Sequence, residues 1–282
     1  MDEEMMFEMS AGSLEGLPSV GEMFDLTGKV AVVSGTIGLA LSVIYRLASC
    51  GAKVVFGARR EVIGQMAEER LREMGLDVRF HKLDVSSVES CREIVAFAEQ
   101  TYGTVDIVVP VAAAFFARAF VDIKESEYDR IVDVDQKGQY FLVQAAARSM
   151  IRGKKGGKVV TVASVAYRGE DMPKLAMMTA YNTAKAGVVG MTRGIAKELK
   201  QYGINVNAIA PGYMDTEMNV ALTDPKNPKF TQQRYDELTQ RIPAHRWGTP
   251  DDMKGCCIFL ASHASDYLGG AIIPVDGGYL VM

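Results

Sequence analysis

The sequence predicts an α/β fold in which a parallel β-sheet carries helices on both faces within a single domain. Short apolar runs with high β-propensity alternate along the chain with longer helical patterns, as in a sheet built from strand–helix–strand units. Many of the short runs are continuously apolar, as strands buried on both faces are. The 282 residues, 48% of them hydrophobic, suit one large domain.

Seven runs are candidate strands, and four longer segments have helical patterns. The strands are expected at 29–34, 53–57, 78–83, 105–110, 158–164, 204–210 and 271–275. The main helices are expected at 61–74, 86–102, 138–152 and 179–202. Two connections, 164–179 and 213–247, are unusually long, the second with a helical piece near 232–240. Both follow a predicted strand at its carboxyl end, where open α/β sheets bind ligands.

The composition and the first residues exclude several classes of protein. The formal net charge of −4 does not favour a nucleic-acid partner, which needs a basic face. The four cysteines form no C-x-x-C pair and the three histidines are far apart, so no metal site is expected. Residues 1–22 are acidic and do not resemble a signal peptide, and no apolar run is long enough to span a bilayer. We therefore expect a tail at 1–22, a domain at 23–282, and a cytoplasmic protein with reduced thiols and no membrane partner.

The run "VVSGTIGLALS" at residues 32–42 is typical of a strand, a phosphate-binding turn and a helix. Gly35 and Gly38 would let the backbone approach a pyrophosphate at the helix N-terminus, with Ile37 between them as a further cofactor contact, although an ordinary tight turn has the same letters. In NAD-binding folds an acidic residue about 20 positions further on binds the ribose hydroxyls. This chain has no acidic residue at that position, and Arg59 comes directly after it. This favours NADP as cofactor with NAD as the alternative, unless Arg59 is merely solvated.

Tyr181 and Lys185 are the strongest candidates for catalysis. They are four residues apart in a helical pattern, so their side chains lie on one face, one turn apart. The pKa of a free tyrosine is near ~10, and an adjacent ammonium would lower it. Tyr181 could then exchange a proton with a substrate oxygen. Ser164, at the end of a predicted strand, could hydrogen-bond the same oxygen.

Further landmarks follow one another in a characteristic order. They are "LDV" at 83–85, "VDIVV" at 105–109, "VDQKG" at 134–138, Ser164, "YNTAK" at 181–185, "NAIAPGYMDT" at 207–216 and "PVDGG" at 274–278. With the opening turn, they resemble the short-chain dehydrogenase/reductase family from about Phe24 to Met282. The chain is most similar to the gluconate 5-dehydrogenase-like sugar-acid and polyol dehydrogenases of that family.

The resemblance implies a doubly wound, Rossmann-like sheet of about seven parallel strands and a nicotinamide cofactor. It implies a homodimer or homotetramer formed through helices near 138–152 and 182–202. Beyond the opening turn and Arg59, it also implies cofactor contacts at Asp84, Val85, Ala112, Tyr181, Lys185, Pro211, Gly212 and Thr216. Asp84 and Val85 would flank the adenine, and Lys185 would hold the nicotinamide ribose.

The chain departs from the family pattern at three places. The opening turn is one residue shorter than T-G-x-x-x-G-x-G, with Ser34 and Ala40 at the positions of the threonine and the last glycine. The family's N-N-A-G segment is "PVAA" at 110–113. Asp135 replaces the family's catalytic asparagine. We expect Asp135 to belong to the catalytic group with Ser164, Tyr181 and Lys185, where it could pair with the lysine.

Together these features predict an NAD(P)(H)-dependent oxidoreductase that interconverts a secondary alcohol and a ketone. A sugar acid or polyol is the favoured substrate, with Arg168, Met172 and Tyr213 as candidate contacts, since arginine suits a carboxylate. A bulky apolar alcohol or ketone such as a steroid is the alternative, because Phe115 and Met177 belong to an apolar wall. A cofactor-binding protein with little turnover is the third hypothesis.

Overall fold

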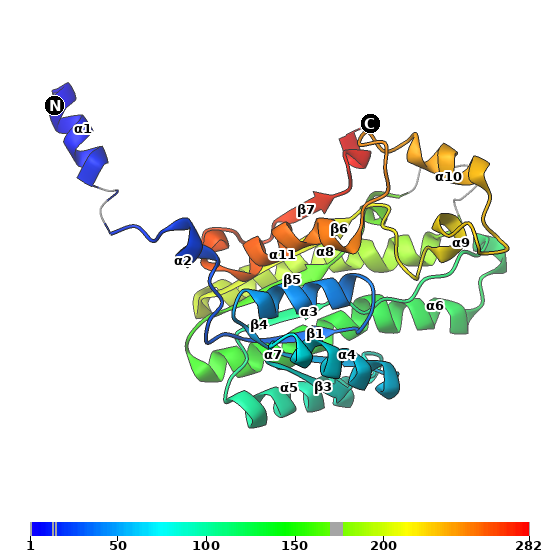
Figure 1. Ribbon diagram of the computed structural model, residues 1–282, viewed down its shortest axis with the longest axis horizontal. Helices are drawn as coiled ribbons and strands as arrows, with labels where there is room; N and C mark the ends of the chain where they lie inside the picture. The colour runs from blue at the N-terminus through cyan, green and yellow to red at the C-terminus, as the bar shows by residue number, and fades with distance from the viewer. Residues whose placement is uncertain (1, 13, 15, 170–176, 282) are drawn as a thin grey trace.

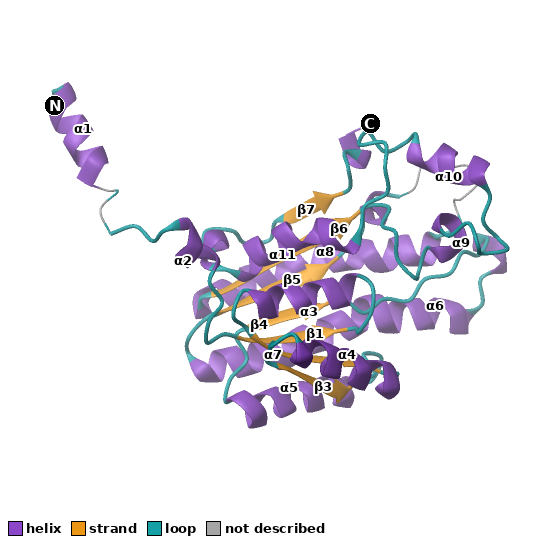
Figure 2. Ribbon diagram, viewed as in Figure 1, coloured by secondary structure: helices purple, strands orange, loops and turns teal. Residues whose placement is uncertain are grey.

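A sheet of seven parallel strands organises the chain, in the order β3-β2-β1-β4-β5-β6-β7 (Figure 2). The computed structural model describes residues 2–12, 14, 16–169 and 177–281. The strands are β1 (Val30–Ser34), β2 (Lys53–Ala58), β3 (Val78–Lys82), β4 (Ile107–Pro110), β5 (Gly157–Val162), β6 (Ile204–Pro211) and β7 (Ile272–Val275).

Helices cover both faces of this sheet (Figure 1). They are α1 (Glu3–Gly12), α2 (Val20–Phe24), α3 (Leu39–Ser49), α4 (Glu61–Glu73), α5 (Val88–Tyr102), α6 (Glu125–Val132), α7 (Gly138–Gly153), α8 (Thr179–Leu199), α9 (Val220–Thr223), α10 (Gln232–Thr239) and α11 (Lys254–Ala261). A π-helix, η2 (Asp133–Lys137), joins α6 to α7. Helices α3, α4 and α11 pack on one face, and α5, α7 and α8 pack on the other.

The central strand β1 explains why the predicted strands are apolar without interruption. Ala31 and Val33 belong to the core beneath α3, whereas Val30 and Val32 belong to the core beneath α5 and α7. All four are at most 2% exposed. Because successive side chains of a strand point to opposite faces, a strand covered on both sides needs apolar residues at every position.

The predicted doubly wound α/β fold is confirmed, and each of the seven expected strands is present with its ends within two residues of the prediction. Pro110 ends β4, a position where its missing N–H costs no ladder bond. The predicted helix at 179–202 is α8 followed by a 3₁₀ turn at Lys200–Tyr202.

The N-terminal segment contains two helices that the sequence did not predict, α1 and α2. Figure 1 shows α1 well away from the sheet, joined to the domain through α2. Ser19 caps α2, with its hydroxyl accepting from Glu22 N and the Glu22 carboxylate accepting from Ser19 N. Within residues 2–12, 14, 16–169 and 177–281, no helix has both the length and the apolarity needed to cross a membrane.

The strand order reverses direction between β1 and β4, and this reversal positions the candidate site. The chain leaves β1 toward α3 on one face of the sheet and leaves β4 toward α6 and α7 on the other. The two connections separate at the carboxyl ends of these strands and leave a crevice there. In Figure 1 this edge of the sheet faces α6, α9 and α10.

Candidate active site

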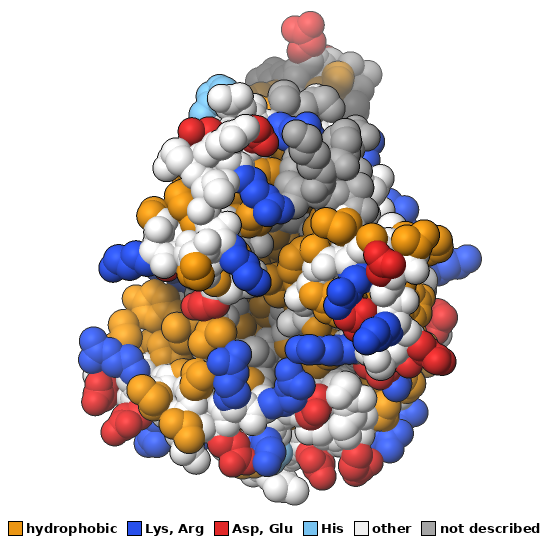
Figure 3. All heavy atoms as spheres, turned by 90° about the vertical axis from the view of Figure 1, so that its right-hand side faces the viewer, with side chains coloured by type: hydrophobic (Ala, Val, Ile, Leu, Met, Phe, Trp, Pro, Cys, Tyr) orange, Lys and Arg blue, Asp and Glu red, His pale blue; other side chains and the backbone are white. Residues whose placement is uncertain are grey.

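A cavity of about 580 Å³ opens at the carboxyl edge of the sheet, within the size range of small-molecule sites. The face drawn in Figure 3 is hollowed there, and Lys and Arg side chains gather around the hollow. The lining residues are Gly35–Ala40, Gly57–Arg60, Leu83–Val85, Val111–Phe115, Arg130, Val134, Val162–Ser164, Tyr181, Lys185, Pro211, Gly212, Met214 and Thr216–Asn219. The cavity thus brings together all of the predicted cofactor residues and all of the predicted catalytic residues except Asp135. Asp135 lies behind Lys185.

The opening turn has the geometry of a phosphate cradle. Gly35 has φ +110° and Gly38 has φ +56°, conformations that side chains with a Cβ adopt only with strain. A Cβ built at Gly35 would lie 2.6 Å from the Cβ of Ala40, so the turn packs closely even with alanine at the last glycine position. Helix α3 begins at Leu39 without a side-chain cap, which leaves its first N–H groups available to an anion. The residues present therefore fit a dinucleotide.

Ser34 ties the opening turn to the "PVAA" segment. Its hydroxyl accepts a hydrogen bond from Ala112 N at 3.0 Å, and Gly35 N donates to Gly57 O at 2.7 Å. These bonds connect the carboxyl ends of three neighbouring strands without the side-chain amides of the family pattern.

Arg59, Asp84 and Val85 line the part of the cavity where the family resemblance predicts the adenosine. The carboxylate of Asp84 accepts from the backbone N–H and the hydroxyl of Ser86, at 3.0 and 2.7 Å, so it caps its own turn. Arg59 follows β2 and is exposed. Within the described part of the chain it forms no ion pair, so its guanidinium can bind an anion.

Tyr181 and Lys185 lie one turn apart on α8, as predicted. The lysine Nζ is 5.4 Å from the centroid of the tyrosine ring. The ring of Phe115 packs edge-on against the tyrosine ring, with the two ring centroids 5.3 Å apart. Lys185 is 1% exposed and its Nζ donates to Val162 O at 3.1 Å. Ser164 follows β5, where its hydroxyl accepts from Ala166 N at 3.2 Å. The three predicted side chains thus meet at the wall of one cavity.

Asp135 lies behind this group in the π-helix η2, and it does pair with the lysine. Its Oδ1 is 3.0 Å from Lys185 Nζ, and both side chains are buried. Its Oδ2 accepts from Ala114 N at 2.8 Å. Burial alone would lower the pKa of Lys185, but the Asp135 carboxylate raises it and the net pKa lies above the ordinary lysine value. Burial raises the pKa of Asp135, and Lys185 acts in the opposite direction.

Two of the predicted substrate residues, Arg168 and Tyr213, do not line this cavity. Arg168, at the end of the 3₁₀ turn Val165–Arg168, donates to Leu280 O at 3.3 Å. Tyr213 packs edge-on against Trp247 and Tyr279. Neither side chain lines the cavity, because Arg168 is held by the C-terminal segment and Tyr213 is held in an aromatic cluster. Met172 lies outside the described residues.

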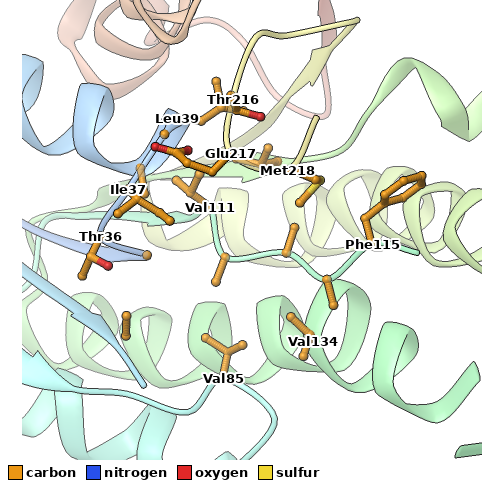
Figure 4. A pocket seen from close by; sticks show the side chains of 18 of the residues that line it. Thr36, Ile37, Leu39, Val85, Val111, Phe115, Val134, Thr216, Glu217 and Met218 are labelled. Carbon is orange, nitrogen blue, oxygen red and sulfur yellow. The ribbon is translucent and has the colours of Figure 1, made fainter. Parts of the chain in front are cut away.

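Sequence reasoning missed the lining residues Arg130, Glu217 and Met218. Figure 4 shows Glu217 pointing toward the opening turn near Ile37 and Leu39, and its Oε2 would be 2.7 Å from a Cβ built at Gly38. Glu217 adjoins the predicted Thr216, so its position depends on how the long connection folds back. Arg130 lies one helical turn before Val134, and that spacing is a signal that could have found it.

Metal or thiol chemistry has no support in the described residues. No group of three His, Cys, Asp or Glu side chains in this part of the chain is placed to hold a metal ion. Burial raises the pKa of the Cys91 thiol to about 11 and that of Cys256 to about 11. Both thiols are therefore protonated at neutral pH and are weak nucleophiles.

Comparison with known proteins agrees with this geometry. A family profile described as Enoyl-(Acyl carrier protein) reductase, adh_short_C2, matches residues 33–280. The 2-dehydro-3-deoxy-D-gluconate 5-dehydrogenase of Escherichia coli is 36% identical over 262 residues, covering 91% of this chain and 97% of the relative. Galactitol 2-dehydrogenase of Agrobacterium fabrum is 34% identical over 259 residues, covering 90% and 98%.

A solved structure is similar over the same length. The crystal structure of a gluconate 5-dehydrogenase from Burkholderia cenocepacia in complex with NADP and tartrate has a TM-score of 0.86 and 30% identity, covering 94% of this chain and 100% of that one. The predicted resemblance is thereby confirmed. The chain belongs to the short-chain dehydrogenase/reductase family and is an NAD(P)-dependent oxidoreductase.

Proposed function

We propose that the protein interconverts a secondary alcohol and a ketone on a sugar acid or polyol, with NADP(H) as the hydride carrier. One observation carries the proposal: Ser164, Tyr181 and Lys185 meet at a cavity that also contains the glycine turn. Two relatives are named for a sugar acid and a polyol, and a similar structure was solved with NADP and tartrate. These names support the substrate class.

In the proposed reaction each side chain has one task. Bound nicotinamide supplies or accepts the hydride. Tyr181 exchanges a proton between its hydroxyl and the substrate oxygen, and Ser164 hydrogen-bonds the same oxygen where negative charge develops. The ammonium of Lys185 favours the ionised form of Tyr181. Phe115 and Val134 form an apolar part of the cavity wall, which would limit the access of water to the reacting atoms.

The preference for NADP is proposed from Arg59. Its guanidinium lines the cavity at the end of β2, and no acid is present there to bind ribose hydroxyls. Arg60, the next residue, lines the same cavity, which adds positive charge beside Arg59.

Arg59→Ala is expected to weaken NADPH binding by about 10- to 100-fold, the worth of one charge-assisted bond pair to a phosphate. NADH binding should change little, since NADH lacks the 2′-phosphate. Fluorescence titration of both nucleotides measures the two affinities. Arg70→Ala is the matched control, because Arg70 lies on α4 and pairs with Glu73 at the surface. Equal loss for both nucleotides would contradict a 2′-phosphate role.

The substrate class is tested with a panel of compounds and NADP⁺, following formation of NADPH. Turnover of gluconate-like sugar acids or of polyols is the expected result. Turnover of steroid alcohols alone would overturn this assignment and favour the apolar substrate, for which Phe115 and Met218 provide contacts in the cavity.

The homodimer or homotetramer implied by the family resemblance stays a proposal, as does the cytoplasmic location. Tyr140 on α7 is 43% exposed and is the kind of side chain that such an interface covers.

A further inference from the structure

Asp135 and Lys185 form a buried ion pair at the candidate site. The two charged atoms are 3.0 Å apart, with the lysine 1% and the aspartate 0% exposed. A buried ammonium without a counter-ion projects its full charge onto its neighbours. A buried ammonium in contact with a carboxylate is close to a neutral pair, so its neighbours experience much less charge.

The fold holds this pair in place from several sides. The π-helix η2 packs closely on α8, where a Cβ built at Gly187 would lie 2.4 Å from the amide of Gln136. Asp135 Oδ2 is held by Ala114 N, and Lys185 Nζ is held by Val162 O. Among the described residues, the contact of Asp135 Oδ1 is the ion pair with Lys185. The π-helical turn, a feature frequent at functional sites, is therefore where the carboxylate enters the site.

Among the described residues, few charged and titratable groups act on the pair. On Lys185 they are Asp135 and Tyr181, and on Asp135 it is Lys185. The loop after β4 contributes the N–H of Ala114, and β5 contributes the carbonyl of Val162. An ionised Tyr181 raises the pKa of Lys185, and by reciprocity the ammonium favours the ionised tyrosine.

We propose that Asp135 is a positioning residue which offsets the charge of Lys185 and so moves the ionisation of Tyr181 to higher pH. The consequence of this shift for catalysis rests on the proposed function, but the titration midpoint of Tyr181 can be measured independently of that function. A carboxylate acts on the tyrosine with the opposite sign to the ammonium. In general, at an effective dielectric of about 20, a unit charge roughly 6 to 10 Å from a titrating group moves its midpoint by about 1 to 2 pH units.

The test is a pH titration of tyrosinate absorbance on the full-length protein without added nucleotide. The chain has eleven tyrosines, so the curve of each protein is corrected by subtracting that of its Tyr181→Phe counterpart. Asp135→Asn keeps the size of the side chain and removes its charge. We expect the Tyr181 midpoint of Asp135→Asn to lie about 1 to 2 pH units below that of the wild type.

Asp133→Asn is the matched control. Asp133 belongs to the same π-helix, but its carboxylate pairs with Lys137 at the surface, 2.9 Å away. The Tyr181 midpoint of Asp133→Asn should therefore equal that of the wild type. Equal midpoints for Asp135→Asn and the wild type would overturn the proposal, because they would mean that the carboxylate does not change the charge that acts on Tyr181. A midpoint that rises in Asp135→Asn would overturn it as well.

If Asp135→Asn does not fold, Asp135→Ser removes the same charge with a smaller side chain, and its Tyr181 midpoint should also lie below that of the wild type. An unchanged midpoint in that variant would overturn the proposal. The outcome is separate from that of the proposed function. A failed catalytic role would appear as turnover in Tyr181→Phe, which the absorbance titration does not measure.

Discussion

Tyr181→Phe is expected to lower kcat by about 10²- to 10⁴-fold, the usual worth of a positioned proton donor or acceptor. The phenol oxygen is the only atom removed, and the ring keeps its edge-on contact with Phe115. KM and nucleotide affinity should therefore change little, and the melting temperature should stay close to that of the wild type. Initial rates with an accepted alcohol and NADP⁺ measure the effect.

Tyr202→Phe provides the control for this experiment. Tyr202 lies in the 3₁₀ turn after α8 and is 46% exposed, so loss of its hydroxyl should leave kcat unchanged. A Tyr181→Phe enzyme with nearly full kcat would mean that another group moves the proton.

Lys185→Met is expected to destabilise the folded protein by about 3–5 kcal/mol, the usual result of removing one partner of a buried ion pair. The variant leaves the Asp135 carboxylate buried without a counter-ion, and it frees the carbonyl of Val162 from one donor. Urea or thermal unfolding measures the loss.

The same variant should show a characteristic pH dependence. Burial raises the pKa of Asp135 in the folded state, and losing the lysine removes the main opposing influence. The folded state then binds a proton that the unfolded state has released, so stability falls as pH rises above the ordinary aspartate pKa of about 3.9. The loss relative to the wild type should therefore be smallest in acid and largest at neutral pH.

Lys197→Met is the control on the same helix. Because Lys197 is exposed on α8, this substitution should change the free energy of unfolding little. A pH-independent loss for Lys185→Met would mean that packing alone accounts for the effect.

The elements that could be predicted from sequence are those whose residues face one environment along their whole length. β1 and β6 are buried at every position, so their apolar runs identified them directly. Tyr181 and Lys185 could be placed together because helical spacing alone determines their relation. The contact of Asp135 with Lys185 was expected as a possibility, since the family pattern places an asparagine there.

Other features depend on contacts between distant segments, and no local pattern encodes these. Glu217 reaches the opening turn only because the connection after β6 folds back over α3. Arg168 was expected to face substrate, but its hydrogen bond is to Leu280, far along the chain. Helix α1 was missed because it has no apolar face that a core would select; Met5, Met6 and Phe7 are all exposed.

The position of β1 in the sheet also has a consequence for how the chain folds during synthesis. β1 is among the first strands made, yet it lies near the middle of the sheet, where Val32 pairs with Val108 of β4. Until β4 emerges, one edge of β1 has no partner, and an unpaired apolar strand edge can pair with other chains. Parallel pairing between such distant segments also slows folding, because the long intervening loop must close first. The strand that organises the cofactor turn is thus the one most exposed to aggregation while the chain is incomplete.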